Sequence, residues 1–230
     1  MITRIHEPVP LPLLVTGVAG VAGYNALDYF RARYGRQVIA IRQEDNWRLT
    51  GPGVVPCDAE DHLKLRALFD EYQFRSVLNC AGNCALRACE LDSRLAWRTN
   101  VEGLVNLLSI IVEREVRLVH LSIDLVYSGE RAGSSPTPSG LEDQPARCGY
   151  LESDPTDPVT VYGKTMVAAE QLIHDWMPQA CMLRISLPMG VSFNGHAGAI
   201  DWIQSRFKHG RPATLYFDEI RTPAYTDCHE

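Results

Sequence analysis

Short apolar runs alternate along this chain with longer stretches in which apolar residues recur every three or four positions. An apolar run bounded by turn residues is typical of a buried strand, and the three-to-four spacing is typical of a helix with one buried face. The pattern predicts strands at 13–15, 38–41, 54–57, 76–80, 118–122, 182–186 and 214–217. It predicts helices at 24–34, 60–72, about 93–114, from near 160, and at 199–208.

This alternation of strands and helices predicts an α/β fold, a Rossmann-like, doubly wound parallel sheet. In the helix at 199–208, Ile200, Ile203 and Phe207 are spaced to bury one side. Segment 128–158 is rich in Gly, Pro and Ser, so we expect a long surface loop there. The apolar stripe of the longest predicted helix consists of Val101, Leu104, Val105, Leu108, Ile111 and Val112.

A run of glycines follows the first predicted strand, with Gly17, Gly20 and Gly23 spaced three residues apart. A strand that turns tightly into a helix offers backbone N–H groups to a pyrophosphate. The dehydrogenase fingerprint has a different spacing, Gly-x-Gly-x-x-Gly, so the glycines alone also fit a turn that is small only for close packing. The helix and second strand that follow complete a βαβ unit and favour a dinucleotide, bound by Gly17, Gly20, Val21, Ala22 and Gly23.

The residue at the end of the second strand indicates which dinucleotide to expect. In dinucleotide-binding folds an acidic residue there favours a free ribose 2′-hydroxyl, whereas a cation tolerates a 2′-phosphate. This position is Arg42, so we expect NADP in preference to NAD. The alternatives are that Arg42 is only a solvated strand-end residue, or that nearby Arg48 serves instead.

Composition and charge narrow the classes of partner. The chain has 230 residues, 46% of them apolar, and a net charge of −6, which argues against nucleic-acid binding. Residues 1–12 lack the basic start and apolar core of a signal peptide, and no run is long enough to cross a bilayer, so we expect a cytoplasmic protein. The seven cysteines lack metal-site spacing, and we interpret them as buried or half-buried thiols without a metal.

Six motifs occur in a fixed order along the chain. They are the glycine run, 57–59 with Asp58, 79–82 with Ala81 and Gly82, 99–103 with Asn100, 122–127 with Asp124, and 161–164 with Tyr162. A seventh is Arg221-Thr222-Pro223. By the order and spacing of these motifs the chain resembles the extended short-chain dehydrogenase/reductases, and within them the dTDP-4-dehydrorhamnose reductase group, over nearly its whole length.

The resemblance implies a reductase that passes hydride from NADPH to the keto carbon of a nucleotide-linked sugar while Tyr162 supplies the proton. It implies an NAD(P)-binding domain at 1–180 and a small, incomplete substrate-binding portion at 181–230, because the family continues into further helices. Asp124 would lie near the site and orient a ligand, or it is an Asx-turn residue. The implied cofactor-binding residues are the glycine run together with Arg42, Asp58, Ala81, Gly82, Asn100 and Tyr162.

Two positions depart from the catalytic pattern of the group. The position of its Ser or Thr is Ile123, which has no hydroxyl, and the position of its Lys is Met166, which has no charge. Ser122 should point to the opposite face of its strand, and Lys164 should face solvent because two helical residues span about 200°. We therefore expect impaired catalysis.

Three functions stay open at this stage. The first is the impaired NADP-dependent reductase. The second is an inactive NADP-binding regulatory protein resembling the regulatory subunit of methionine adenosyltransferase. The third is a degenerate product that binds nothing specific. A homodimer through the helices at 93–114 and from near 160 is a further expectation, although both helices also suit covering the sheet.

Overall fold

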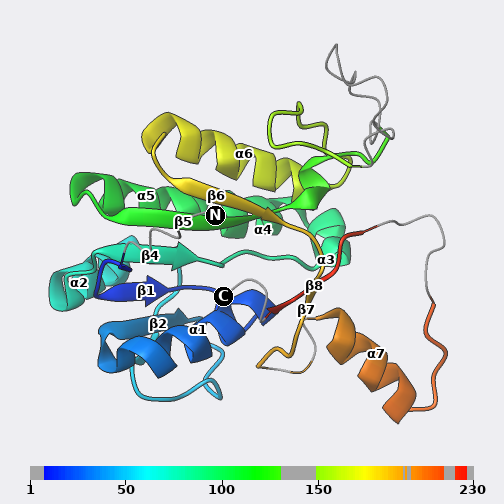
Figure 1. Ribbon diagram of the computed structural model, residues 1–230, viewed down its shortest axis with the longest axis horizontal. Coiled ribbons are helices and arrows are strands. Elements are labelled where there is room, and N and C mark those ends of the chain that lie inside the picture. The colour runs from blue at the N-terminus through cyan, green and yellow to red at the C-terminus, as the bar shows by residue number, and fades with distance from the viewer. Residues whose placement is uncertain (1–7, 131–148, 194, 196–197, 215–220, 227–230) are drawn as a thin grey trace, which may run out of the picture.

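The computed structural model describes residues 8–130, 149–193, 195, 198–214 and 221–226. In this part of the chain the main sheet has six parallel strands in the order β3-β2-β1-β4-β5-β6 (Figure 1). The order reverses between β1 and β4, so this is the predicted doubly wound, Rossmann-like sheet. The strands are β1 Leu13–Val15, β2 Val38–Arg42, β3 Val54–Pro56, β4 Ser76–Asn79, β5 Arg117–Ile123 and β6 Cys181–Ile185.

Helices connect these strands on both faces of the sheet. The α-helices are α1 Val21–Tyr34, α2 His62–Tyr72, α3 Leu86–Leu91, α4 Ser93–Trp97, α5 Gly103–Glu113, α6 Val161–Trp176 and α7 Ala199–Lys208. Two short segments are the more tightly wound 3-10 helices η1 Gly35–Gln37 and η3 Asp124–Val126. One is the more widely wound π-helix η2 Arg98–Glu102.

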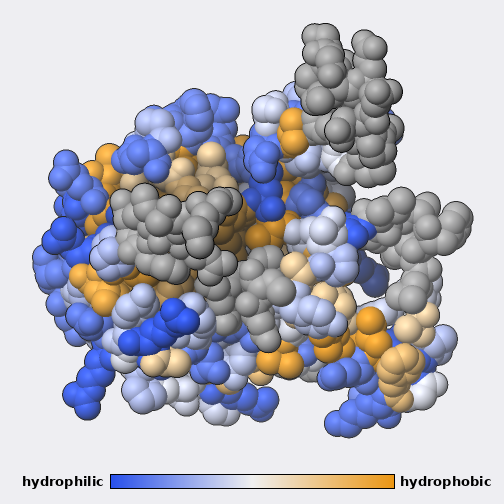
Figure 2. Space-filling view, viewed as in Figure 1, coloured by the Kyte–Doolittle hydropathy of each residue, from blue (hydrophilic) through white to orange (hydrophobic). Residues whose placement is uncertain are grey.

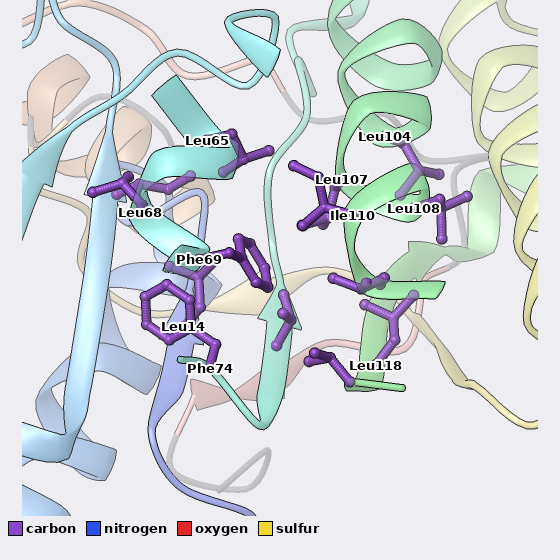
Figure 3. Close-up of a cluster of buried hydrophobic side chains, with 14 of the residues drawn as sticks. Leu14, Leu65, Leu68, Phe69, Phe74, Leu104, Leu107, Leu108, Ile110 and Leu118 are labelled. Carbon is purple, nitrogen blue, oxygen red and sulfur yellow. The ribbon is translucent and has the colours of Figure 1, made fainter. Parts of the chain in front are cut away.

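The larger hydrophobic core lies between the sheet and the helices α2, α5 and α6. Leu14 and Leu118 contribute from the strands, and Phe69 and Leu108 from α2 and α5 (Figure 3). Ile173 contributes from α6. Full burial of such a side chain stabilises the fold by about 1.5–3 kcal/mol. On the opposite face α1 packs over β1 and β2. The buried residues there are Leu13, Val15, Leu27, Val38 and Ala40.

The predicted helices need three corrections of extent, the smallest being that α2 begins at His62 rather than at 60. The first helix begins at Val21 rather than at 24. The helix predicted at about 93–114 is interrupted, because η2 separates α4 from α5 by a π-helical turn. Within α5, Leu107 and Ile110 are buried whereas Val112 is 41% exposed, so the buried face differs from the predicted stripe.

A small C-terminal part joins the carboxyl edge of the sheet. Here β7 Pro188–Met189 pairs in parallel with β8 Ala224–Tyr225, beside α7 (Figure 1). Asp201 in the first turn of α7 is buried and accepts hydrogen bonds from Ser192 and the Gly198 N–H. The expectation that Phe207 is buried is wrong, because the last turn of α7 extends away from the sheet and leaves this ring 72% exposed.

Some expected segments fall partly outside the described residues. Of the strand expected at 214–217, Thr214 has no regular structure and 215–217 lie outside the description. Of the loop expected at 128–158, residues 131–148 also lie outside it. The described ends of this loop meet, since Asp157 accepts hydrogen bonds from the Ser128 N–H and hydroxyl at 2.9 and 2.8 Å.

The cysteines do not all behave as expected. Cys57 and Cys89 are buried and Cys80 is half-buried, but Cys84 and Cys181 are exposed, which corrects that part of the interpretation. Cys84 follows the β4 loop and Cys181 begins the edge strand β6, where fewer neighbours cover them. Within the described ranges, none of the helices combines the length and apolar character needed to span a membrane.

Candidate active site

The three glycines after β1 have different steric surroundings. Gly17 has φ +65°, and a Cβ atom on it would lie 2.1 Å from the Cys80 carbonyl oxygen. A Cβ atom on Gly23 would lie 2.4 Å from the Gly17 carbonyl oxygen. A Cβ atom on Gly20 would meet only ordinary contact, 3.5 Å from that same oxygen. Packing therefore requires Gly17 and Gly23, whereas the missing side chain at Gly20 opens the turn to a ligand.

This turn opens directly into the N-terminus of α1. Gly20 is the N-cap without a side-chain cap, and no acidic residue occupies the first turn. The N–H groups of Val21, Ala22 and Gly23 therefore have no carbonyl partner within the helix. Together with the helix dipole, these donors suit a pyrophosphate, so the residues present fit a dinucleotide.

A buried polar network joins this turn to the loop after β4. The Thr16 hydroxyl donates to Asn79 Oδ1 at 2.6 Å and accepts the N–H groups of Cys80 and Ala81 at 3.1 and 3.2 Å. The β1 and β4 carboxyl ends meet where the strand order reverses, which is where α/β sheets bind ligands. The predicted residues Ala81 and Gly82 therefore lie beside the glycine turn.

Asn100 lies behind that same loop, within the π-helical turn η2. Its Oδ1 accepts the Asn83 N–H at 2.6 Å, and its Nδ2 donates to Thr165 Oγ1 of α6 at 2.9 Å. The side chain is buried, and both ends of its amide are engaged with protein. Asn100 therefore fixes the loop with Gly82 against α6, which is a positioning role beside the predicted site.

Arg42 and Asp58 lie at the carboxyl ends of the neighbouring strands β2 and β3. Arg42 donates from Nη1 to the carbonyl oxygens of Gln43 and Glu44 at 2.8 and 3.0 Å. Asp58 Oδ1 accepts the Glu44 N–H at 2.9 Å. These bonds fix the turn that follows β2. The guanidinium of Arg48, the alternative cation for a 2′-phosphate, lies over the Trp47 ring, 5.2 Å from its centre.

Tyr162 lies in the first turn of α6, which begins after the N-cap Thr160. The Thr160 hydroxyl accepts the Gly163 N–H at 3.0 Å. A Cβ atom on Gly163 would lie 2.2 Å from the Leu125 carbonyl oxygen, so glycine lets α6 approach η3 closely. Burial raises the pKa of the Tyr162 phenol, Cys84, Cys89 and Asp124 raise it further, and Arg221 lowers it. Tyr162 is therefore held as a neutral acid.

Apolar side chains occupy the two positions that depart from the family pattern. Met166 is 4% exposed and packs with Tyr162 and Ile123 in one hydrophobic cluster. Neither residue supplies a hydroxyl or an ammonium group. The expectation for Lys164 is confirmed, because it is exposed, and the Ser122 hydroxyl is engaged with Glu170 of α6, to which it donates at 2.5 Å.

Asp124 is the centre of a polar cluster at the carboxyl edge. It accepts hydrogen bonds from Arg221 Nε and Nη2 at 2.7 and 2.6 Å. The Ser186 hydroxyl donates to it at 2.5 Å and accepts the Thr222 N–H at 3.1 Å. The motif Arg221-Thr222-Pro223 is the sequence signal for this cluster, and no pattern in the sequence indicates the part that Ser186 plays.

The described ranges hold no group of three or more His, Cys, Asp or Glu side chains arranged to bind a metal ion.

The predicted site residues divide into three groups along one edge of the sheet. The glycine turn with Ala81 and Gly82 is central, Arg42 and Asp58 lie toward β3, and Tyr162 and Asp124 lie toward β6.

The fold and the glycine turn place this chain among the Rossmann-like α/β proteins. More specifically, it belongs to the family described as RmlD substrate binding domain, whose sequence pattern matches residues 12–228.

Two relatives of this chain carry reductase names. The chain is 26% identical over 91% of its length to the "Probable low-salt glycan biosynthesis reductase Agl14" of Haloferax volcanii, covering 65% of that protein. It is 30% identical over 72% of its length to the dTDP-4-keto-6-deoxy-D-glucose reductase of Streptomyces niveus, covering 48% of it. The chain therefore spans about half to two thirds of these relatives.

A solved structure has the same fold. The dTDP-4-dehydrorhamnose reductase of Bacillus anthracis, in complex with NADP, superposes with a TM-score of 0.72 at 17% identity. The match covers 96% of this chain and 68% of that one.

Proposed function

We propose that this protein is an NADP-dependent reductase of a nucleotide-linked keto-sugar, similar to dTDP-4-dehydrorhamnose reductase, with impaired catalysis. The observation that carries the proposal is that one edge of the sheet holds both the glycine turn, with the open N-terminus of α1, and the buried Tyr162 at the start of α6. The names of the relatives support the substrate class, and the NADP complex of the Bacillus anthracis reductase supports a nicotinamide cofactor.

Each group of residues has a defined part in this proposal. The N–H groups of Val21, Ala22 and Gly23 bind the pyrophosphate, and Arg42 turns from its carbonyl partners to a 2′-phosphate. A bound reduced nicotinamide supplies hydride. Tyr162, held neutral by burial, donates the proton to the substrate oxygen. Asp124 and its partners shape the sugar end of the site.

The proposed impairment follows from Ile123 and Met166. Ile123 has no hydroxyl to orient the carbonyl, and Met166 has no ammonium group to lower the tyrosine pKa. Positioned proton transfer contributes about 10²–10⁴ in rate, so turnover should be slower by a factor in that range.

A second candidate is an inactive NADP-binding regulatory protein. The observation that favours it is the apolar cluster around Tyr162, which replaces two of three catalytic functions with packing. Cytoplasmic location, a homodimer and the domain boundary near 180 stay predictions alongside either function.

Binding and turnover experiments distinguish these proposals. Titration with NADPH and NADH, followed by quenching of the four tryptophans, should give micromolar binding with NADPH favoured. Slow NADPH oxidation with a dTDP-4-keto-6-deoxy sugar, abolished in Tyr162→Phe, would support the reductase. Binding without turnover would support the regulatory protein, and no binding of either dinucleotide would overturn both.

The double variant Ile123→Thr/Met166→Lys tests the impairment itself. If these two positions limit the chemistry, the variant should gain turnover by about 10²–10⁴-fold, the range that positioned proton transfer contributes. Leu63→Thr/Leu91→Lys is a control at exposed positions outside the site. An equal rate in the restored and control variants would contradict the explanation.

A further inference from the structure

A cleft of about 720 Å³ lies between α4, the π-helical turn η2 and the first turn of α6. Small-molecule sites in proteins have volumes of about 300–1,000 Å³, so the size of this cleft suits one such ligand. Neither the glycine turn nor Tyr162 lines it. It also lies away from α7, over which Figure 2 shows exposed apolar side chains. The cleft is therefore separate from the proposed active site and from the C-terminal part.

Three cations line this cleft without a partner. Arg94 of α4, Arg98 of η2 and Lys164 of α6 are exposed, and their side chains form no hydrogen bond or ion pair with the described residues. By contrast, Arg66 and Arg114 each pair with a carboxylate. Like charges around a concave surface concentrate the positive potential inside it. A bound anion would give all three side chains a partner.

Two carboxylates also line the cleft, and they do not cancel its positive charge. Asp92 is the N-cap of α4, where its Oδ1 accepts the Leu95 N–H at 2.9 Å. Glu102 is exposed at the end of η2. Three cations and two carboxylates leave the lining net positive in a chain whose net charge is −6. This local exception to the acidic character of the chain favours an anionic ligand.

An indole ring lies beside these charges. Trp97, the last residue of α4, lines the same cleft and is 46% exposed, so its ring is accessible to a ligand. An accessible aromatic ring offers a flat surface on which a nucleobase stacks, whichever base it is. Cations together with such a ring suit a ligand that joins phosphate groups to a base.

Hydrogen bonds hold the walls of the cleft together. Asn100 of η2 donates from Nδ2 to Thr165 Oγ1 at 2.9 Å, and Glu90 of α3 accepts the Val161 N–H at 2.7 Å. Val161 and Thr165 both line the cleft. The backbone of the cleft is thus fixed before any ligand binds, which lowers the cost of binding. A π-helical turn inserted between two α-helices, such as η2, is also frequent at functional sites.

We infer that this cleft is a second nucleotide site, which binds a nucleoside polyphosphate. The phosphate groups contact Arg94, Arg98 and Lys164, and the base stacks on Trp97. The inference does not rest on the proposed reductase function, because neither the glycine turn nor Tyr162 takes part in it.

Calorimetric titrations with ATP and with inorganic triphosphate test the two halves of the site. Both should bind, and ATP more tightly, because only ATP carries a base. Arg94→Gln/Arg98→Gln/Lys164→Gln should weaken the binding of both at least about tenfold, because hydrogen bonds to charged groups are lost. Trp97→Ala should weaken ATP binding at least about fivefold, the lower end of what base stacking contributes, and leave triphosphate binding unchanged.

A triple variant outside the cleft is the matched control. Arg36→Gln/Arg75→Gln/Lys208→Gln removes the same charges at exposed positions that do not line the cleft, and it should bind both probes as the parent chain does. An equal loss in the two triple variants would mean that only the net charge matters, and it would overturn the inference. If the cleft variant does not fold, Trp97→Ala still decides, because equal effects on ATP and triphosphate would exclude stacking.

The variant Gly20→Ala distinguishes the cleft from the glycine turn, and it should keep the ATP affinity that the cleft variant loses. Loss of ATP binding in Gly20→Ala alone would place ATP at the dinucleotide site and overturn the inference. Binding of neither probe at millimolar concentration would also overturn it. Sedimentation equilibrium adds a last check, because a dimer that the cleft variant converts to a monomer would assign this face to a second copy of the chain instead.

Discussion

Gly23 packs so closely on Gly17 that a Cβ atom at position 23 would lie 2.4 Å from the Gly17 carbonyl oxygen. Real Cβ atoms do not approach backbone oxygens to that distance, so the start of α1 and the end of β1 depend on glycine at 23. Gly20, between them, has φ −80° and no such contact. We therefore assign the stability of this turn to Gly23 and the proposed binding of a ligand to Gly20.

The first prediction separates these two roles. Gly23→Ala should lower the free energy of unfolding by roughly 1–3 kcal/mol, the usual cost of overpacking, or prevent folding. Gly20→Ala should change it by less than about 1 kcal/mol but weaken NADPH binding at least about tenfold, because its methyl group fills the ligand side of the turn. Urea unfolding and NADPH titration measure the two effects. Equal loss of stability in both variants would contradict the assignment.

The second prediction concerns the choice of dinucleotide. Arg42→Ala should weaken NADPH binding by about 10–100-fold, the worth of a hydrogen bond to a charged group, and leave NADH binding nearly unchanged. Arg48→Ala should affect neither, because that guanidinium lies over Trp47. Paired titrations with both dinucleotides give the answer. A loss of NADPH preference in Arg48→Ala alone would transfer the role to Arg48.

Local patterns were enough to predict the sheet and the glycine turn. The apolar runs at β1, β2 and β5 are short and bounded by turn residues, and the turn lies within a few residues of β1. The exposure of Lys164 also followed from helical geometry alone.

Features made by distant segments could not be predicted in this way. Arg221 and Asp124 are 97 residues apart, and only the folded sheet edge brings them together. Which side of α5 is buried depends on α2 and α6, which pack against it, so spacing within the helix predicts Val112 in the stripe and omits Leu107. The exposure of Phe207 likewise depends on where α7 ends relative to the sheet, which spacing within the helix does not encode.

The third prediction tests the buried ion pair beneath the site. Glu170 accepts Arg184 Nε and Nη2 at 2.9 and 2.7 Å, and its side chain is 8% exposed. Arg184→Leu should lower the free energy of unfolding by about 3–5 kcal/mol, because a buried carboxylate loses its partner. The double variant Arg184→Leu/Glu170→Gln should recover part of this loss. Denaturant unfolding measures both.

A surface pair is the control for that prediction. Arg66 and Glu113 are 2.9 Å apart with side chains 42% and 55% exposed, so Arg66→Leu should cost less than about 1 kcal/mol. A similar cost for Arg66→Leu and Arg184→Leu would mean that burial adds nothing to the inner pair.

The fourth prediction is that the folded chain loses stability in mild acid because of His120. This histidine is buried in β5, its Nδ1 lies 2.9 Å from Asn79 Nδ2, and its Nε2 has no hydrogen-bond partner among the described residues. Because Asn79 Nδ2 can only donate, Nδ1 accepts and the ring is neutral. Burial lowers the His120 pKa to about 4, although Glu170 opposes the shift.

The sign of the effect follows from where the proton binds. Between pH 6.5 and 4 the unfolded chain protonates this histidine and the folded chain does not, so stability falls as the pH drops through that window. The largest loss is about 3 kcal/mol, from a shift of roughly 2.5 units at 1.36 kcal/mol each. Urea unfolding at pH 7.5, 6.0, 5.0 and 4.5 should show this decline in the parent chain and a flatter profile in His120→Gln. The exposed His209, in a matched His209→Gln variant, should keep the parental profile, and an unchanged slope in His120→Gln would place the acid sensitivity elsewhere.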